Sequence, residues 1–191
     1  IELIPENIPI NIVYEDDDSV LNPQSPYAES KLFIENSLKE IDGLQYMILR
    51  LGTVCGVSKG MRFQTCINKF CYQAVFKQPL TVWEQNLKLV RPYLSLSDLN
   101  RTIQFILDNN WEKFNRKTYN ILTTNLSLED IIESVRVNEP SLTIHPVDCP
   151  LLNQFSYNVS FEKIQKEGLL FVGNISIDIK EIINLLQGVK K

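Results

Sequence analysis

The 191-residue chain has a formal net charge of −4 and is 44% hydrophobic and 22% charged. This composition is ordinary for a globular protein, and the length allows one good core, or one domain and part of another. The sequence holds no run of five lysines and arginines. We therefore do not expect nucleic acid or an anionic membrane as a partner, and small-molecule chemistry is favoured.

Residues 1–24 are rich in Pro, Asn and Asp and include the acidic run from Glu15 to Asp18. They predict an extended surface loop. Beyond them, helices and short apolar strands alternate without internal repeats, which is an α/β signature. The predicted elements are a helix over 26–41, a strand over 45–51, a helix over 62–77, strands over 80–83 and 88–94, a helix over 97–109, a strand over 117–122, a helix opened by Ser127, a strand over 142–147, a helix over 160–167 capped by Ser160 and closed by Gly168, and a final helix over 176–186.

Four cysteines and a single histidine, His145, form no recognisable zinc pattern, so we expect no metal. We interpret the cysteines as reduced and mostly buried thiols, with Cys66 and Cys71 inside an apolar helical pattern. His145 is expected on a strand. The chain has no apolar run near 18 residues and no basic signal peptide, so a cytoplasmic location is expected. Its opening Ile1 indicates a processed, truncated or separately expressed piece.

Ser25-Pro26-Tyr27-Ala28-Glu29-Ser30-Lys31 is the most informative stretch of the sequence. Ser25 can cap the first helix, and Pro26 suits its first position because the missing N–H would be unpaired anyway. Tyr27 and Lys31, four residues apart, then share a face, and a nearby ammonium favours the phenolate form that accepts a proton. Among the seven tyrosines, Tyr27 alone has a lysine four residues on. The alternative interpretation is an exposed amphipathic helix start.

The seven glycines do not form a glycine-rich turn between a strand and a helix. A dinucleotide-binding site needs such a turn, so that the backbone can approach a pyrophosphate at the helix N-terminus. Gly52, Gly56 and Gly60 follow Tyr27 and are expected at loop bends. We therefore interpret the chain as the back half of an enzyme.

Three segments, in order, resemble the extended short-chain dehydrogenase/reductase family, and specifically its NAD-dependent sugar-nucleotide epimerases and dehydratases. They run from Asn22 to Lys31, from Leu49 to Gly56 and from Arg91 to Leu99. The resemblance implies the C-terminal part of a Rossmann-like doubly wound α/β fold plus the small substrate-binding domain, with the N-terminal cofactor half absent. Residues 1–60 would be the Rossmann remnant and 61–191 mostly the substrate-binding region, with segments around 80–122 as candidates to return to the Rossmann sheet.

The resemblance also implies roles by position. Tyr27 would be the acid/base that takes the sugar hydroxyl proton, and Lys31 would hold the ribose of NAD, so both would contact the cofactor. Thr53, Asn68 and Arg91 would bind the substrate, a nucleotide-diphosphate sugar, with Arg91 on its diphosphate. The alternatives are a strand-end hydroxyl for Thr53, an exposed helix residue for Asn68 and a surface cation for Arg91.

The leading hypothesis is the C-terminal portion of an NAD-dependent epimerase or dehydratase that is inactive as this chain alone. The alternative is a non-catalytic nucleotide-sugar-binding or interaction module, or one half of a split enzyme. The expected protein partner is a second copy of the chain or a complementing N-terminal half, because uncovered apolar faces and strand edges invite association.

Overall fold

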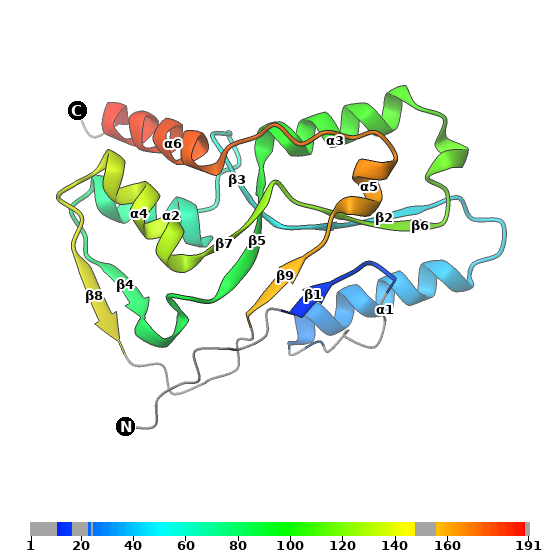
Figure 1. Ribbon diagram of the computed structural model, residues 1–191, viewed down its shortest axis with the longest axis horizontal. Coiled ribbons are helices and arrows are strands. Elements are labelled where there is room, and N and C mark those ends of the chain that lie inside the picture. Colours follow the sequence, from blue (N-terminus) through cyan, green and yellow to red (C-terminus); the bar gives the residue numbers. More distant parts are fainter. Residues whose placement is uncertain (1–10, 17–22, 24, 148–155, 190–191) are drawn as a thin grey trace.

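The computed structural model describes residues 11–16, 23, 25–147 and 156–189. Helix α1 lies along β2 and β6 at one end of the molecule, and α2, α4 and α6 gather at the other (Figure 1). The strands are β1 (Asn11–Val13), β2 (Met47–Leu51), β3 (Thr53–Cys55), β4 (Leu80–Trp83), β5 (Val90–Ser95), β6 (Lys117–Ile121), β7 (Thr124–Ser127), β8 (Ile144–Val147) and β9 (Tyr157–Val159), and the helices are α1 (Pro26–Glu40), α2 (Cys66–Val75), α3 (Leu96–Asp108), α4 (Leu128–Asn138), α5 (Glu162–Lys166) and α6 (Ile175–Val189).

Parallel strand pairs dominate the described residues. β2 pairs with β6, β3 with β5, β4 with β8 and β1 with β9, all in parallel, whereas β5 and β7 pair antiparallel. Parallel neighbours need a crossover connection, which here contains helices, as between β2 and β6. The expected α/β fold class is therefore confirmed.

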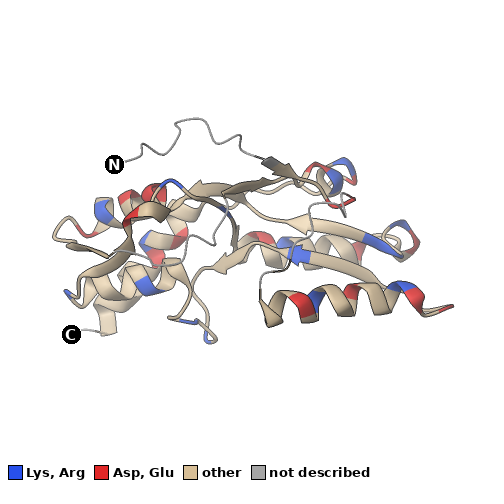
Figure 2. Cartoon of the chain, turned by 90° about the horizontal axis from the view of Figure 1, so that it is seen from below, with Lys and Arg blue, Asp and Glu red and all other residues tan. Residues whose placement is uncertain are grey.

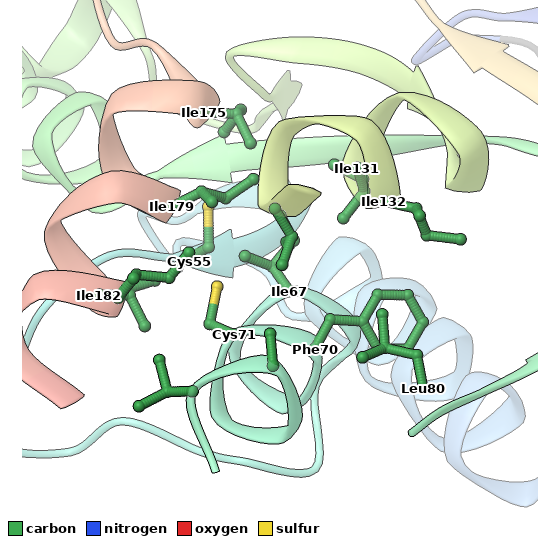
Figure 3. Packing of buried hydrophobic residues seen from close by; sticks show 14 of the residues in the cluster. Cys55, Ile67, Phe70, Cys71, Leu80, Ile131, Ile132, Ile175, Ile179 and Ile182 are labelled. Carbon is green, nitrogen blue, oxygen red and sulfur yellow. The ribbon is translucent and has the colours of Figure 1, made fainter. Parts of the chain in front are cut away.

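The larger core lies between α2, α4 and α6 and the strands beside them. On α6 the apolar residues follow helical spacing, so one face of the helix is buried throughout. Ile179, at the centre of that face, is fully buried, and Figure 3 shows it among side chains from α2 and α4. The buried members of this core are Cys55, Ile67, Phe70, Cys71, Ala74, Val75, Leu80, Val82, Tyr93, Ile131, Ile132, Val135, Ile175, Ile179, Ile182, Ile183 and Leu186.

A smaller core is formed where α3 and α5 meet β5 and β6. Phe114 is central to it, because its ring contacts those of Phe105 and Tyr119 edge-on, at centroid distances of 5.9 and 6.2 Å. Such tilted contacts suit the charge distribution of aromatic rings. The buried members are Leu94, Ile106, Phe114, Tyr119, Ile121, Ile164 and Leu169.

Most predicted elements are confirmed within a few residues, but two helix starts were wrong. The helix predicted over 62–77 begins at Cys66, because the apolar residue that extended the pattern, Phe63, stacks on Tyr72 from the preceding loop. The helix predicted from Ser160 begins at Glu162. Ser160 follows β9, and its N–H donates to the carbonyl of Val13. Its hydroxyl accepts from the N–H of Glu162 at 3.4 Å, so the predicted capping contact is present.

The interpretation of residues 1–24 as a surface loop was wrong for residues 11–13, where the structure has a strand. β1 forms there by pairing with β9, and such a strand of three residues leaves no periodic signal. Glu15 is only 5% exposed, and its Oε1 accepts a hydrogen bond of 3.0 Å from the backbone N–H of Asn120. Asp16 does lie in solvent, paired with Lys163 at 2.7 Å. Asp17 and Asp18 lie outside the described residues.

The thiols of Cys55 and Cys71 are free and buried, as expected, whereas Cys66 is half-buried. Burial raises the pKa of the Cys71 thiol to about 12 and that of the Cys66 thiol to about 11. These thiols therefore stay protonated and unreactive at neutral pH. Cys149 lies outside the described residues. His145 lies on β8, as predicted.

Basic and acidic residues are interspersed along the described elements (Figure 2). No helix in the described ranges has both the length and the apolar character to cross a membrane. Within the same ranges, no three His, Cys, Asp or Glu residues are arranged to hold a metal ion.

Candidate functional site

The start of α1 has the geometry that the sequence predicts. The Ser25 hydroxyl accepts a hydrogen bond of 3.2 Å from the N–H of Ala28, and Pro26 opens the helix. Tyr27 is 73% exposed, and the ammonium nitrogen of Lys31 lies 5.3 Å from the centroid of its ring. The phenol and the ammonium therefore share one face of the helix, and both are open to solvent.

Helix α1 has no buried side chain. Glu35, one turn after Lys31, forms a bidentate ion pair with Arg50 on β2, with Nη2 of Arg50 2.6 Å from Oε2 of Glu35. At the other end of the helix, Arg116 donates to the carbonyls of Lys39 and Ile41. Polar contacts thus hold the helix that carries Tyr27.

The two strands that follow α1 approach a third strand closely. Gly52 separates β2 from β3, and a Cβ there would meet the carbonyl group of Pro92 at 3.1 Å, which a larger residue would have to push aside. Thr53, the first residue of β3, is exposed and lies opposite Tyr93 on β5. Arg91 lies two residues earlier on β5. The structure thus places Thr53 and Arg91 on neighbouring strands.

Arg91 is held in a defined orientation. Its guanidinium carbon lies 4.9 Å from the ring centroid of Tyr157, and Nη1 donates to the carbonyl of Val90 at 2.9 Å. A cation stacked on an aromatic ring is attracted by the face of the ring, so this contact fixes the plane of the guanidinium. Tyr157 borders a pocket of about 280 Å³ that is lined by Val13, Arg50, Leu51, Gly52, Pro92, Asn120, Leu122, Tyr157 and Val159.

Asn68 is 4% exposed, which contradicts the alternative of an exposed helix residue. Its Nδ2 donates to the carbonyl of Arg62 at 3.1 Å, and its buried Oδ1 has no hydrogen-bond partner among the described residues. The loop that it supports, from Met61 to Thr65, lines an open pocket of about 710 Å³. A buried acceptor without a partner lowers the stability of the fold, so a ligand donor that reached this oxygen would gain a favourable hydrogen bond.

The structure brings Tyr27 and Lys31 into contact and places Thr53 near Arg91, whereas Asn68, on α2, bonds to the loop that precedes its helix. Sequence reasoning missed Glu35 and Arg50. The spacing held a usable signal, because Tyr27, Lys31 and Glu35 follow one another at four-residue intervals.

The residues present fit the ribose and nicotinamide end of a dinucleotide. An exposed hydroxyl and an exposed ammonium on one helix face are donors that a ribose diol accepts. All seven glycines fall in described residues, and their surroundings include no cradle at a strand-to-helix turn for a pyrophosphate. Among the described residues, the donors at the start of α1 therefore fit a ribose, whereas the surroundings of the glycines do not fit a pyrophosphate.

Comparison with known proteins confirms the family that the sequence resembles. A model of the NAD dependent epimerase/dehydratase family matches residues 3–121, more than half of the sequence, and the chain therefore belongs to this family.

Solved structures of the same fold include UDP-glucose 4-epimerase of Thermus thermophilus with NAD (TM-score 0.73, 19% identity, covering 87% of this chain and 55% of that chain). The Thermotoga maritima UDP-glucose 4-epimerase with UDP-glucose has a TM-score of 0.76 at 16% identity, with 97% and 60% covered. UDP-glucuronic acid 4-epimerase of Bacillus cereus, with UDP-glucuronic acid and NAD, has a TM-score of 0.76 at 18% identity, with 88% and 54% covered. The chain thus spans little more than half the length of these proteins.

Proposed function

We propose that this chain is the C-terminal portion of an NAD-dependent sugar-nucleotide epimerase or dehydratase. It supplies the acid/base pair Tyr27 and Lys31 and part of the substrate pocket. Family membership supports the reaction class, and the contact between Tyr27 and Lys31 is the observation that carries the assignment. Residues 1–60 belong to the Rossmann region and residues 61–191 mostly to the substrate-binding region, with β6 beside β2 as a returning segment.

Tyr27 accepts a proton from a sugar hydroxyl at its phenolic oxygen. The ammonium of Lys31 lies beside the Tyr27 ring, and its N–H groups would donate to the ribose hydroxyls of the cofactor. When bound, the nicotinamide supplies a hydride acceptor. The exposure of both side chains gives a dinucleotide and a sugar access to the same helix face.

Arg91 binds the diphosphate of the substrate, because a guanidinium can donate two parallel hydrogen bonds to phosphate oxygens. Its contact with Tyr157 fixes the plane of the guanidinium. Thr53 contributes a hydroxyl on the neighbouring strand, and the free Oδ1 of Asn68 accepts from the nucleotide sugar.

Ligand titration tests the substrate assignment directly on residues 1–191. We expect UDP-glucose to bind measurably by calorimetry or NMR, and Arg91→Met to weaken binding about tenfold or more, the loss of a charge-assisted hydrogen bond. Arg101→Met, at an exposed position on α3, is the matched control. Equal binding by the Arg91 and Arg101 variants would remove Arg91 from the site.

Residues 1–191 alone do not catalyse turnover. Positioning contributes several kcal/mol to catalysis, and the described residues provide no site for the pyrophosphate that would hold the nicotinamide in reach. NAD-dependent conversion of a UDP- or GDP-sugar by this polypeptide, or tight NAD binding to it, would refute this proposal.

The exposed side of α1 favours a second candidate, an interaction module or one half of a split enzyme. Phe33 is 72% exposed and Ile34 49%, and β2 pairs with β6 alone among the described strands. Such surfaces invite a second copy or a complementing half. A strictly monomeric state in light scattering, unchanged over a wide concentration range, would argue against it.

A further inference from the structure

Helix α1 is not held in place by a buried apolar face. None of its side chains is fully buried: Leu32 and Leu38 are half-buried, and Phe33 and Ile34 are exposed. In most amphipathic helices, burial of one face fixes the rotation of the helix about its axis. For α1, other contacts must decide which way Tyr27 and Lys31 point.

Glu35 is the α1 side chain that reaches a strand in the hydrogen bonds and ion pairs of the described residues. Nε of Arg50 lies 3.0 Å from Oε1 of Glu35, and Nη2 lies 2.6 Å from Oε2. The side chains of Arg50 and Glu35 are 20% and 15% exposed, so water screens the pair weakly. By contrast, the hydroxyls of Ser30 and Ser37 bond to carbonyls of α1 itself.

Arg50 is itself fixed from a second direction. Its Nη1 donates to the carbonyl of Glu15 at 3.3 Å. The side chain of Glu15 is buried and accepts from the backbone of Asn120 on β6. The guanidinium therefore sits between α1, the turn after β1 and the β2–β6 pair, with little freedom to follow a rotating helix.

The spacing of α1 connects this ion pair to the site. Tyr27, Lys31 and Glu35 are four residues apart, so they form one stripe along the helix. Each residue of an α-helix advances about 100° around the axis, so a rotation that turned Glu35 away from Arg50 would carry Tyr27 with it. Arg116 contacts backbone carbonyls at the far end of α1 and so anchors that end along the axis.

We propose that Glu35 and Arg50 are positioning residues that set the rotation of α1 and thereby the direction in which Tyr27 and Lys31 face. The catalytic relevance of this proposal rests on the proposed function, whereas the effect of the ion pair on the orientation of α1 does not. A bidentate pair suits this role better than a single contact, because two parallel bonds fix an angle as well as a distance.

Residues 1–191 are labelled with 3-fluorotyrosine, and the Tyr27 resonance is followed by ¹⁹F NMR. The resonance that is missing from the Tyr27→Phe variant identifies Tyr27. For Glu35→Gln we expect this resonance to shift or broaden, and the amides of α1 to exchange with solvent about tenfold faster or more, since a charge-assisted contact is lost. Amides of α2, α4 and α6 should exchange at the wild-type rate. The charge-swapped variant carrying both Glu35→Arg and Arg50→Glu should restore part of the wild-type signal.

Glu133→Gln is the matched control, because it breaks an exposed ion pair with Arg136 on α4 and should leave Tyr27 and α1 unchanged. An unmoved Tyr27 resonance with wild-type exchange in Glu35→Gln would overturn the proposal. A loss of protection in all helices together would also overturn it, since the pair would then support the whole fold. Neither readout needs NAD or substrate. If the helix reorients and Tyr27→Phe keeps full turnover once a dinucleotide-binding unit is supplied, the positioning role stands and the catalytic role is refuted.

Discussion

Where α2, α4 and α6 pack on one another, each helix buries an apolar face, whereas α1 buries no side chain and is tied down by arginines. The first arrangement draws its stability from apolar area removed from water, about 25 cal/mol per Å². The second draws on a few charged hydrogen bonds, each of modest net value. The helix proposed to carry the catalytic tyrosine is thus stabilised less by apolar burial than α2, α4 and α6 are.

The largest effect is expected in the buried core. Ile179→Ala removes a fully buried side chain from the centre of α6 and should lower the free energy of unfolding by about 2–5 kcal/mol. Urea denaturation measures the loss. Ile177→Ala, at a position 56% exposed on the same helix, should change it by less than about 0.5 kcal/mol. Similar losses at both positions would show that α6 does not pack as described.

A buried carboxylate on α3 bonds to two segments that are distant from it in sequence. Asp98 is fully buried and accepts from the hydroxyl of Thr123 at 2.7 Å and from the N–H groups of Val172 and Gly173. Asp98→Ala leaves these donors without a partner and should cost about 2–3 kcal/mol in urea denaturation. Asp108→Ala, at the exposed end of the same helix, serves as the control. A loss below about 0.5 kcal/mol for Asp98→Ala would contradict the described network.

The pH dependence of stability should have opposite signs at two carboxyls. Burial raises the pKa of Asp178, so its ionisation destabilises the fold as the pH rises through that raised value. Although burial opposes it, hydrogen bonds from Tyr119, Lys117 and Lys113 lower the pKa of Glu167, and the stability this gives is lost as the pH falls through the lowered value. Relative to wild type, Asp178→Asn should therefore gain and Glu167→Gln lose stability between acid and neutral pH. Urea midpoints at several pH values check both signs.

The smallest effect is expected on the exposed face of α1. Phe33→Ala should change the free energy of unfolding by less than about 0.5 kcal/mol, because Phe33 is 72% exposed. A larger loss that grows with protein concentration would show that a second copy covers this face in solution.

The sequence was sufficient for the elements with strong periodicity. The final helix was predicted over 176–186 and is α6, where five buried apolar residues follow helical spacing. The helix predicted to open at Ser127 is α4, where Ser127 and Asp130 form a capping box. The contact of Tyr27 with Lys31 followed from their four-residue spacing. In each case the information is local, so residues close in sequence fix the geometry.

Strands and side-chain contacts that form with residues distant in sequence could not be predicted from the local pattern. β1 and β9 exist because they pair with each other across more than 140 residues of chain. Glu15 looked like one more loop acid, yet it is buried against β6. The Glu35–Arg50 pair likewise depends on where a helix and a strand meet, and Tyr157 became relevant once the fold placed it beneath Arg91.

The central claim is that Tyr27 is the acid/base of a sugar-nucleotide enzyme. Measuring turnover by matched tyrosine variants tests this claim most directly. The polypeptides are supplied with a dinucleotide-binding unit, in the same chain or as a separate one, and assayed with NAD and UDP-glucose. The account predicts that Tyr27→Phe lowers kcat by about 100-fold or more, while Tyr14→Phe, at another exposed tyrosine, stays at the wild-type rate. Equal turnover by wild type and Tyr27→Phe would contradict it.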